Sequence, residues 1–306
     1  MRKNLFKLSS LLLLLLVFFS AFSAPVSALG EEREGRIADN PNFEREYLSL
    51  GAVRSKSVGS YAAVSLYING RAQSFYGRVI NGEVYLPVRK VAQSVAGVSA
   101  SYNSKTRTLT VPSYSISVSD GAYVLYASGR PLFAMTPSVI LSDGAMYTPA
   151  SVLTKAFGIK YAYTGTRAVN LTGKAAPLTP AERFYREDEV YWLSRIINAE
   201  SRGEALIGQI GVGNVVMNRV RSSEYPNTIW GVIFDRKYGV QFSPVLDGSI
   251  YAEPTYTAYL AAKICLEGFM ISDKTLFFLY PQASTSSWIP KYRKYEFTIG
   301  KHDFYS

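Results

Sequence analysis

Cysteine and histidine, which most often bind metals or cross-link a fold, are almost absent from this chain. Among its 306 residues there is one cysteine, Cys265, and one histidine, His302. A single cysteine excludes an internal disulfide, so a packed core must hold the fold. A zinc amidase needs several histidine ligands, which this chain lacks. A Cys–His peptidase is disfavoured, because Cys265 falls near the end of an apolar helical segment where a thiolate is unfavourable. We therefore expect a buried core cysteine, a structural histidine, no metal and no cofactor.

Long apolar runs are also lacking, except at the N-terminus. Three basic residues within the first seven positions precede the apolar run 11–19, and the small residues 26–28 are typical of a signal-peptidase site. This pattern predicts a signal peptide over 1–28 and an exported protein. An uncleaved anchor is the alternative, although the run is shorter than the ~20 residues that a span needs. We expect no membrane span after cleavage.

The basic residues form no run that would favour nucleic acid. The formal charge is +10, and without the three basic residues of the signal segment it becomes about +7. A moderate positive charge favours anionic surfaces such as cell-wall polymers or anionic lipid. Scattered lysines and arginines, together with export, exclude nucleic acid as the expected partner.

The middle of the chain contains a repeat of roughly sixty residues. The segment 66–71 recurs at 125–130, and 82–87 recurs at 144–149. The pattern of each copy predicts, in this order, a strand, a glycine turn, a second strand, a hairpin, a helix with proline in its first turn, and a final strand. We expect the two copies to pack as one small α+β domain over 61–172.

These repeats resemble the copper amine oxidase N-terminal-like domain, or stalk domain, which bacteria often attach to exported wall enzymes. The resemblance covers about 64–172 and rests on Tyr-Leu-Pro-Val-Arg at 85–89 and the weaker copy Tyr-Thr-Pro-Ala-Ser at 147–151. It implies a spacer or wall-binding module, or a structural duplication without a ligand. It does not imply copper, because one histidine cannot supply a copper site.

Linkers flank this domain. Residues 29–60 show no sustained period, and prolines interrupt any regular element within 173–186. Beyond them, over 187–306, the pattern becomes helical. Its apolar period predicts three helices, at 187–199, 206–220 and 254–266. Glycines at 208, 211 and 213 lower the helix propensity of the second segment, but they would let another backbone approach closely.

Glu200 occupies a position where the helical pattern calls for an apolar residue. Leu193 and Ile197 precede it at helical spacing, so its carboxyl group completes an inward stripe. Burial and the negative end of the helix both raise a carboxyl pKa. A carboxylic acid that is protonated near neutral pH is what a glycoside-cleaving enzyme needs. In the alternative interpretation, Glu200 is a surface residue paired with Arg195 or Arg202.

Six motifs follow one another through the C-terminal part of the chain. They lie at 192–204, 215–220, 226–229, 241–244, 288–289 and 299–305. In this order they resemble the spore cortex-lytic, or SleB-type, cell wall hydrolase family. The resemblance implies a mainly α-helical, lysozyme-like domain that cuts the glycan strands of peptidoglycan. It also implies that the first glutamate of Ala-Glu-Ser-Arg-Gly-Glu, Glu200, is catalytic.

Two reactions are open to a catalytic Glu200. A hydrolase needs a second carboxylate, whereas a lytic transglycosylase uses the C6 hydroxyl of the muramic acid as nucleophile and needs one acid that then becomes the base. The resemblance favours a lytic transglycosylase acting at the MurNAc–GlcNAc linkage. The candidate second carboxylates for a true muramidase are Glu204, Asp235, Asp247 and Glu253, and no spacing fixes any of them opposite Glu200.

Substrate binding is expected from aromatic and amide groups. Phe242 and Tyr280 could present ring faces to sugars, and Gln241 and Ser243 could hydrogen-bond them.

Taken together, the sequence predicts a monomeric, secreted α+β protein of two domains, associated with the wall or spore. Its expected partner is peptidoglycan. Asn198, Lys301 and Asp303 depart from the family pattern, and they leave a non-catalytic wall-binding protein as the alternative.

Overall fold

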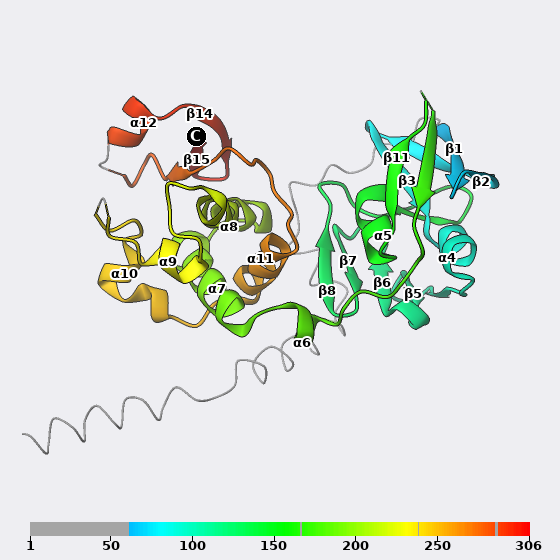
Figure 1. Ribbon diagram of the computed structural model, residues 1–306, viewed down its shortest axis with the longest axis horizontal. Helices are drawn as coiled ribbons and strands as arrows, with labels where there is room; N and C mark the ends of the chain where they lie inside the picture. Colours follow the sequence, from blue (N-terminus) through cyan, green and yellow to red (C-terminus); the bar gives the residue numbers. More distant parts are fainter. Residues whose placement is uncertain (1–60, 166, 238, 285–286) are drawn as a thin grey trace, which may run out of the picture. The chain divides into compact units, whose positions relative to one another are not determined.

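Strands dominate the first part of the described chain and helices the second (Figure 1). The computed structural model describes residues 61–306 except 166, 238 and 285–286. The predicted signal peptide and the linker 29–60 lie outside the described residues. Within the described residues, no helix has the length and apolar character that crossing a membrane requires.

The sheet part, 62–172, contains twelve named strands and two α-helices. They are β1 (Ala62–Ile68), β2 (Arg71–Ile80), β3 (Glu83–Pro87), α4 (Val88–Ala96), β4 (Ser101–Asn103), β5 (Thr108–Val111), β6 (Ile116–Ser119), β7 (Val124–Ala127), β8 (Arg130–Phe133), β9 (Val139–Ile140), β10 (Met146–Pro149), α5 (Ala150–Ala156), β11 (Lys160–Tyr163) and β12 (Ala168–Thr172).

The predicted hairpins of the repeat are present at corresponding places. Asn69 and Gly70 have φ of 47° and 79° between β1 and β2, and Ser128 and Gly129 have 53° and 73° between β7 and β8. Two successive left-handed residues match the twist of the flanking strands, which explains the glycine at each turn. The helices α4 and α5 follow Pro87 and Pro149 directly, so each proline precedes the first turn.

The strands of the two predicted copies intermix in two sheets. One sheet has the order β11-β12-β1-β2-β3-β10-β9, and the other has β4-β5-β6-β7-β8. β1 and β12 pair in parallel, while their other neighbours are antiparallel. The order of elements thus recurs as expected, whereas a duplication as the origin of the domain stays a prediction.

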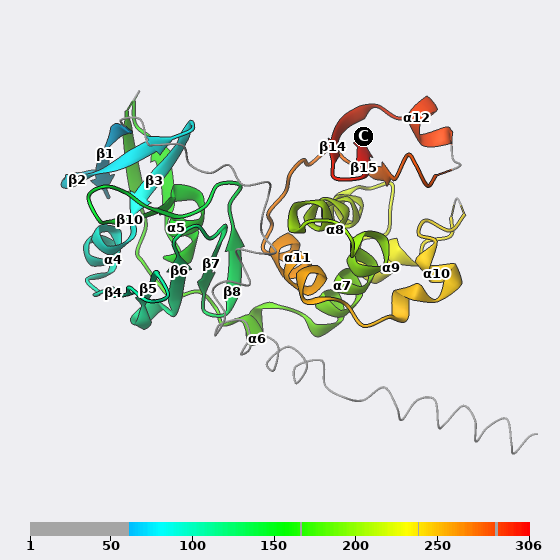
Figure 2. The same ribbon diagram turned by 180° about the vertical axis from the view of Figure 1, so that it is seen from behind.

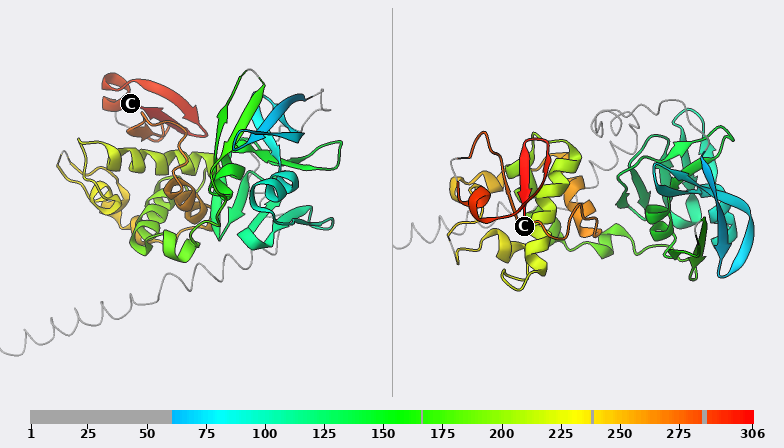
Figure 3. Two further views of the ribbon diagram at one scale, coloured as in Figure 1. Left: turned by 45° about the vertical axis from the view of Figure 1, so that its right-hand side comes forward. Right: turned by 90° about the horizontal axis from the view of Figure 1, so that it is seen from above.

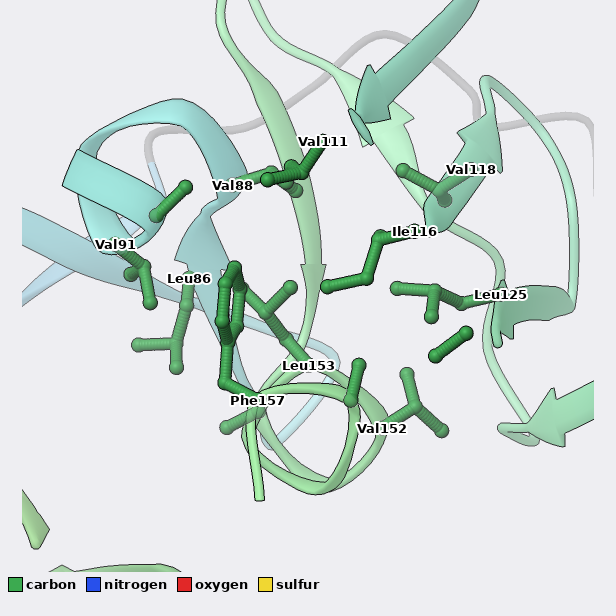
Figure 4. Packing of buried hydrophobic residues seen from close by; sticks show 14 of the residues in the cluster. Leu86, Val88, Val91, Val111, Ile116, Val118, Leu125, Val152, Leu153 and Phe157 are labelled. Atoms are coloured by element: carbon green, nitrogen blue, oxygen red, sulfur yellow. The ribbon is translucent and has the colours of Figure 1, made fainter. Parts of the chain in front are cut away.

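Buried aliphatic and aromatic side chains fill the sheet part. Figure 4 shows Leu153, in the middle of α5, and Phe157, just beyond its end, facing Leu86 of β3 and Ile116 of β6. Each of these side chains is at most 1% exposed. Side chains recur on one face every 3.6 residues along a helix and every two residues along a strand, and these four side chains lie on the faces that point into the core.

The helical part, 187–305, is built on three long helices that pack on one another (Figure 2). Its elements, preceded by α6 (Ala181–Phe184), are α7 (Glu187–Ser201), α8 (Leu206–Arg221), α9 (Ile229–Ile233), α10 (Pro244–Asp247), η2 (Ser249–Tyr251), α11 (Tyr256–Leu266), β13 (Phe277–Leu279), α12 (Trp288–Tyr292), β14 (Tyr295–Ile299) and β15 (His302–Tyr305). The three predicted helices are confirmed as α7, α8 and α11. The short helices and the sheet β13-β15-β14 were not predicted, because each is too short to show a period.

The glycines of α8 make room for neighbouring side chains. The expectation that another backbone approaches them closely is wrong. A Cβ atom on Gly211 would lie 2.7 Å from the ring of Phe304, which follows from β15 lying over α8 (Figure 3). A Cβ atom on Gly213 would lie 2.7 Å from Sγ of Cys265 and 2.8 Å from Cδ1 of Ile197. At Gly213, side chains of α7 and α11 therefore pack tightly against α8.

We expect Gly213→Ala to destabilise the protein by up to about 2 kcal/mol, because overpacking costs about 1–3 kcal/mol and alanine regains only ~1 kcal/mol in helix propensity. Urea unfolding followed by tryptophan fluorescence measures the change. Gly203→Ala is the control, since a Cβ atom there meets no atom within 4 Å. Equal stability of the two variants would contradict close packing at Gly213.

Candidate active site

Glu200 lies in the last turn of α7, at the end of the predicted inward stripe. Val190, Leu193 and Ile197 are at most 4% exposed, and Glu200 itself is largely but not fully buried. Burial raises the pKa of the Glu200 carboxyl from 4.5 to about 7. The negative charge of Asp247 contributes to this rise, and the positive charge of Arg219 opposes it. Near neutral pH, the Glu200 carboxyl is therefore protonated in a large fraction of the molecules.

The interpretation of Glu200 as a surface residue in an ion pair does not hold. Arg195 instead donates to the backbone carbonyls of residues 251–252, at 2.9 and 2.6 Å, and to the carboxylate of Glu253 at 3.1 Å. Arg202 is exposed, and no ion pair within the described part of the chain joins it to Glu200. Nothing described therefore neutralises a Glu200 carboxylate by direct contact.

Arg219, in the last turn of α8, is the main residue that sequence reasoning missed. Its side chain is buried, and its Nε donates to the carbonyl of Leu276 at 2.8 Å. One terminal nitrogen also donates to Oε1 of Gln241 at 3.4 Å. The guanidinium lies 5.1–5.4 Å from the ring centres of Tyr225, Phe242 and Phe277. A buried charge held on several sides is fixed in position, and it places positive potential near Glu200. The available signal was that Arg219 continues the helical spacing of Val212 and Val216, which are both buried.

The structure brings Gln241 to Arg219 and gives Phe242 a different role from the one expected. The Gln241 amide donates to the carbonyl of Gly239 at 3.1 Å while its oxygen faces Arg219. Phe242 is 3% exposed and belongs to the core of the helical part. Its ring therefore supports Arg219 and is not available to a sugar face. Ser243 is exposed directly before α10.

Tyr280, the fourth expected binding residue, lies elsewhere in the helical part. It follows β13, and its ring centre is 6.1 Å from that of His302. The Tyr280 hydroxyl donates to Oε1 of Gln282 at 3.1 Å. The side chain is half-buried, and Nζ of Lys301 lies 6.0 Å from its ring centre.

All four candidate second carboxylates have a hydrogen-bond or ion-pair partner. Glu204 accepts from the Lys301 backbone at 3.2 Å, Glu253 pairs with Arg195, and Asp235 accepts from the Lys237 backbone at 2.9 Å. Asp247 is the one whose charge acts on Glu200. It accepts the backbone N–H of Ser249 at 2.8 Å, and hydrogen bonds from Ser249 hold the pKa of Asp247 below its usual range. Asp247 is therefore a stable negative charge beside a neutral acid.

Cys265 is a buried core cysteine, as predicted. His302 is also buried, but among the described residues its Nδ1 has no hydrogen-bond partner. Burial raises the pKa of the Cys265 thiol to about 12, which removes it as a nucleophile. Burial also lowers the pKa of His302, whose ring packs against Phe278 and Phe304. Within the described residues, no group of three or more metal-binding side chains is close enough to hold an ion.

Comparison with known proteins identifies both parts of the chain. Residues 203–305 match the family described as cell wall hydrolase, and residues 67–171 match the copper amine oxidase N-terminal domain. The first match begins three residues after Glu200. The chain therefore carries a domain of each of these families, and both predicted resemblances are confirmed.

The relatives are spore cortex-lytic enzymes. One from Bacillus cereus is 37% identical over 123 residues, which cover 39% of this chain and 45% of that protein. One from Bacillus subtilis (strain 168) is 33% identical, covering 39% and 38%. The chain thus spans less than half the length of these curated relatives.

A solved structure, the catalytic domain of the germination-specific lytic transglycosylase SleB from Bacillus anthracis, is 35% identical, with a TM-score of 0.37. It is matched over its whole length by 42% of this chain. The catalytic domain of the Bacillus cereus SleB protein is 36% identical with a TM-score of 0.36, and the match covers 40% of this chain and 92% of that one.

The raised pKa of Glu200 makes the stability of the fold depend on pH. Below pH 4.5 the carboxyl is protonated in both folded and unfolded chains, whereas above about pH 7 the fold must hold a buried carboxylate. We therefore expect Glu200→Gln to gain stability relative to the wild type as the pH rises from 4.5 to above 7. At ~1.4 kcal/mol per pKa unit the gain is at most on the order of 3 kcal/mol.

Urea unfolding at a series of pH values measures this difference. Glu224→Gln removes the same charge from an exposed position and should follow the wild type throughout. A difference between Glu200→Gln and the wild type that does not change with pH would show that the Glu200 carboxyl has an ordinary environment.

Proposed function

We propose that this protein cleaves the glycan strands of peptidoglycan, with Glu200 as the catalytic acid. The observation that carries the proposal is the largely buried Glu200 carboxyl with a pKa of about 7. A group with this pKa can donate a proton near neutral pH and can also act as a base once it has lost it. The cell wall hydrolase domain and the spore cortex-lytic relatives support the same chemistry.

In the proposed reaction, Glu200 protonates the bridging oxygen as the bond from C1 of the muramic acid to that oxygen breaks. The released sugar leaves with this proton as its new hydroxyl. The C6 hydroxyl of the same muramic acid then attacks C1 and gives its proton to the Glu200 carboxylate. The product is an anhydro-muramic end, and Glu200 returns to its protonated state. Arg219 stabilises the carboxylate between the two steps, because its buried positive charge opposes the rise in the Glu200 pKa.

A muramidase is the second candidate, and Asp247 is the observation that favours it. Its negative charge acts on Glu200, so it is the candidate carboxylate that could orient a water molecule. In that reaction water takes the place of the C6 hydroxyl and the product carries a reducing end. The relatives' solved lytic transglycosylase domain supports the first candidate.

Export to the cell wall or spore fits this activity, since peptidoglycan lies outside the cytoplasmic membrane. We place the boundaries of the two domains at 61–172 and 187–306, with Gln241, Ser243 and Tyr280 as the sugar contacts. Phe242 supports Arg219 from the core.

Replacing Glu200 by glutamine should abolish cleavage, because an amide cannot donate the proton. General acid catalysis contributes about 10²–10⁴-fold, so we expect at least a 100-fold loss. Purified wall or spore cortex is digested, and the released ends are identified by mass spectrometry. Anhydro-muramic ends support the transglycosylase and reducing ends the muramidase. If the wild type releases nothing while Glu224→Gln and the wild type both bind the wall, the protein is a binding module.

The activity should fall on the alkaline side with an apparent pKa of about 7 in the wild type. Asp247→Asn removes a negative charge that raises the Glu200 pKa, so the alkaline limb should move to lower pH. Initial rates of cortex digestion from pH 5 to 9 measure the limb. Asp273→Asn, in an exposed loop, serves as the charge-matched control. A limb that stays in place in Asp247→Asn means that Asp247 does not act on Glu200.

A further inference from the structure

Glu267, which directly follows α11, is a buried carboxylate whose partners come from outside the helical part. Its side chain is 2% exposed. Arg130 of β8 donates to it through two nitrogens, at 2.7 and 2.8 Å. Lys155 of α5 lies 2.8 Å from its second oxygen and also donates to the Glu267 backbone carbonyl at 2.5 Å. Tyr185, between the two parts, donates its hydroxyl at 2.5 Å.

Apolar contacts surround this ionic cluster. Val124 and Phe133 of the sheet part belong to the same hydrophobic cluster as the core of the helical part. The rings of Phe133 and Phe269 meet edge to face with their centres 4.8 Å apart. The hydroxyls of Tyr126 and Tyr256 lie 3.1 Å apart. All these residues fall within one compact unit of the chain, Pro41–Ser306.

The charge of Glu267 is satisfied by groups from outside the helical part. Burial raises the pKa of Glu267, but hydrogen bonds from Arg130, Lys155 and Tyr185 outweigh it and hold the pKa below the usual range. The guanidinium of Arg130 is itself 7% exposed and lies 3.3 Å from the ring centre of Phe184. Separating the two parts would break these hydrogen bonds and expose the apolar side chains around them to water. Removing one charged partner inside the intact contact would leave the other charge buried without it, which is far costlier than burying the pair.

The cluster also continues toward the candidate active site. The segment after Glu267 is held to α8 by Asn214, which bonds the backbone of Phe269 and Ile271 at 2.8 Å each. Arg219 bonds the carbonyl of Leu276 at the end of the same segment. A contact that fixes the start of this segment therefore helps to fix Arg219, whose charge acts on the Glu200 pKa.

We propose that the sheet part is a structural partner docked on the helical part through Glu267, and that the two unfold as one cooperative unit. The sheet part is then neither a free spacer nor an independent wall-binding module. The proposal does not depend on glycan cleavage, because unfolding is measured without substrate.

The distribution of tryptophan makes the test sharp. The three tryptophans of the chain, Trp192, Trp230 and Trp288, all lie in the helical part. Their fluorescence during urea unfolding of the full chain therefore reports that part alone. Hydrogen exchange of peptides from 108–127, read by mass spectrometry at the same urea concentrations, reports the sheet part. We expect the two midpoints to coincide in the wild type.

The decisive variant is Arg130→Met, which changes only the sheet part. It leaves Glu267 without its bidentate partner, so the tryptophan midpoint should fall and the unfolding constant should rise about 100-fold or more. Arg107→Met is the matched control. Arg107 is half exposed and pairs with Asp120 inside the sheet part. Because an exposed ion pair contributes little to stability, its loss should leave the tryptophan midpoint almost unchanged even though the two parts unfold together.

Two results would overturn the proposal. One is a wild-type tryptophan transition that is separate from the exchange transition of the sheet part. The other is a tryptophan midpoint that Arg130→Met does not move. The wild-type comparison needs no variant, so it decides the matter even if Arg130→Met does not fold.

Discussion

The cost of placing a carboxyl group in an apolar wall is the constraint on which the site depends. Glu200 ends a stripe of buried aliphatic side chains, and burial moves its pKa to about 7. A fold that tolerates this cost must keep strong positive partners out of direct contact, and Arg195 is indeed bound to other groups. The same fold places Arg219 where its positive charge reduces the rise in the Glu200 pKa. Among the described contacts the two side chains form no ion pair, which would abolish that rise.

Buried polar side chains on α8 connect this site to the rest of the helical part. Asn214, Asn218 and Arg219 all bond backbone groups of the segment 269–276. Backbone groups in such a segment have no ladder of their own, and these side chains satisfy them inside the core. On the same helix, Gly211 and Gly213 leave room for Phe304 and Cys265. One helix therefore combines close packing with the polar contacts that position Arg219.

In the Glu267 cluster, the surroundings shift the pKa of a buried carboxyl in the opposite direction from that of Glu200. Glu200 lacks a directly bonded cation among the described residues and its pKa rises, whereas Glu267 has Arg130, Lys155 and Tyr185 and its pKa falls. The first arrangement suits a group that exchanges protons, and the second suits a group that keeps its charge. Two glutamates in one domain thus differ in expected role because their neighbours differ.

The sequence alone determined the elements that follow a period: α7, α8, α11, the paired hairpin turns and the inward position of Glu200. These depend on spacing within one segment, which a single chain displays directly. The short helices, the sheet β13-β15-β14, the burial of Phe242 and the roles of Arg219, Asp247 and Glu267 were decided by tertiary structure. Each depends on residues brought together from distant segments, such as the 137 positions between Arg130 and Glu267. Charge and exposure at such sites are properties of the assembled neighbourhood, and no local pattern encodes them.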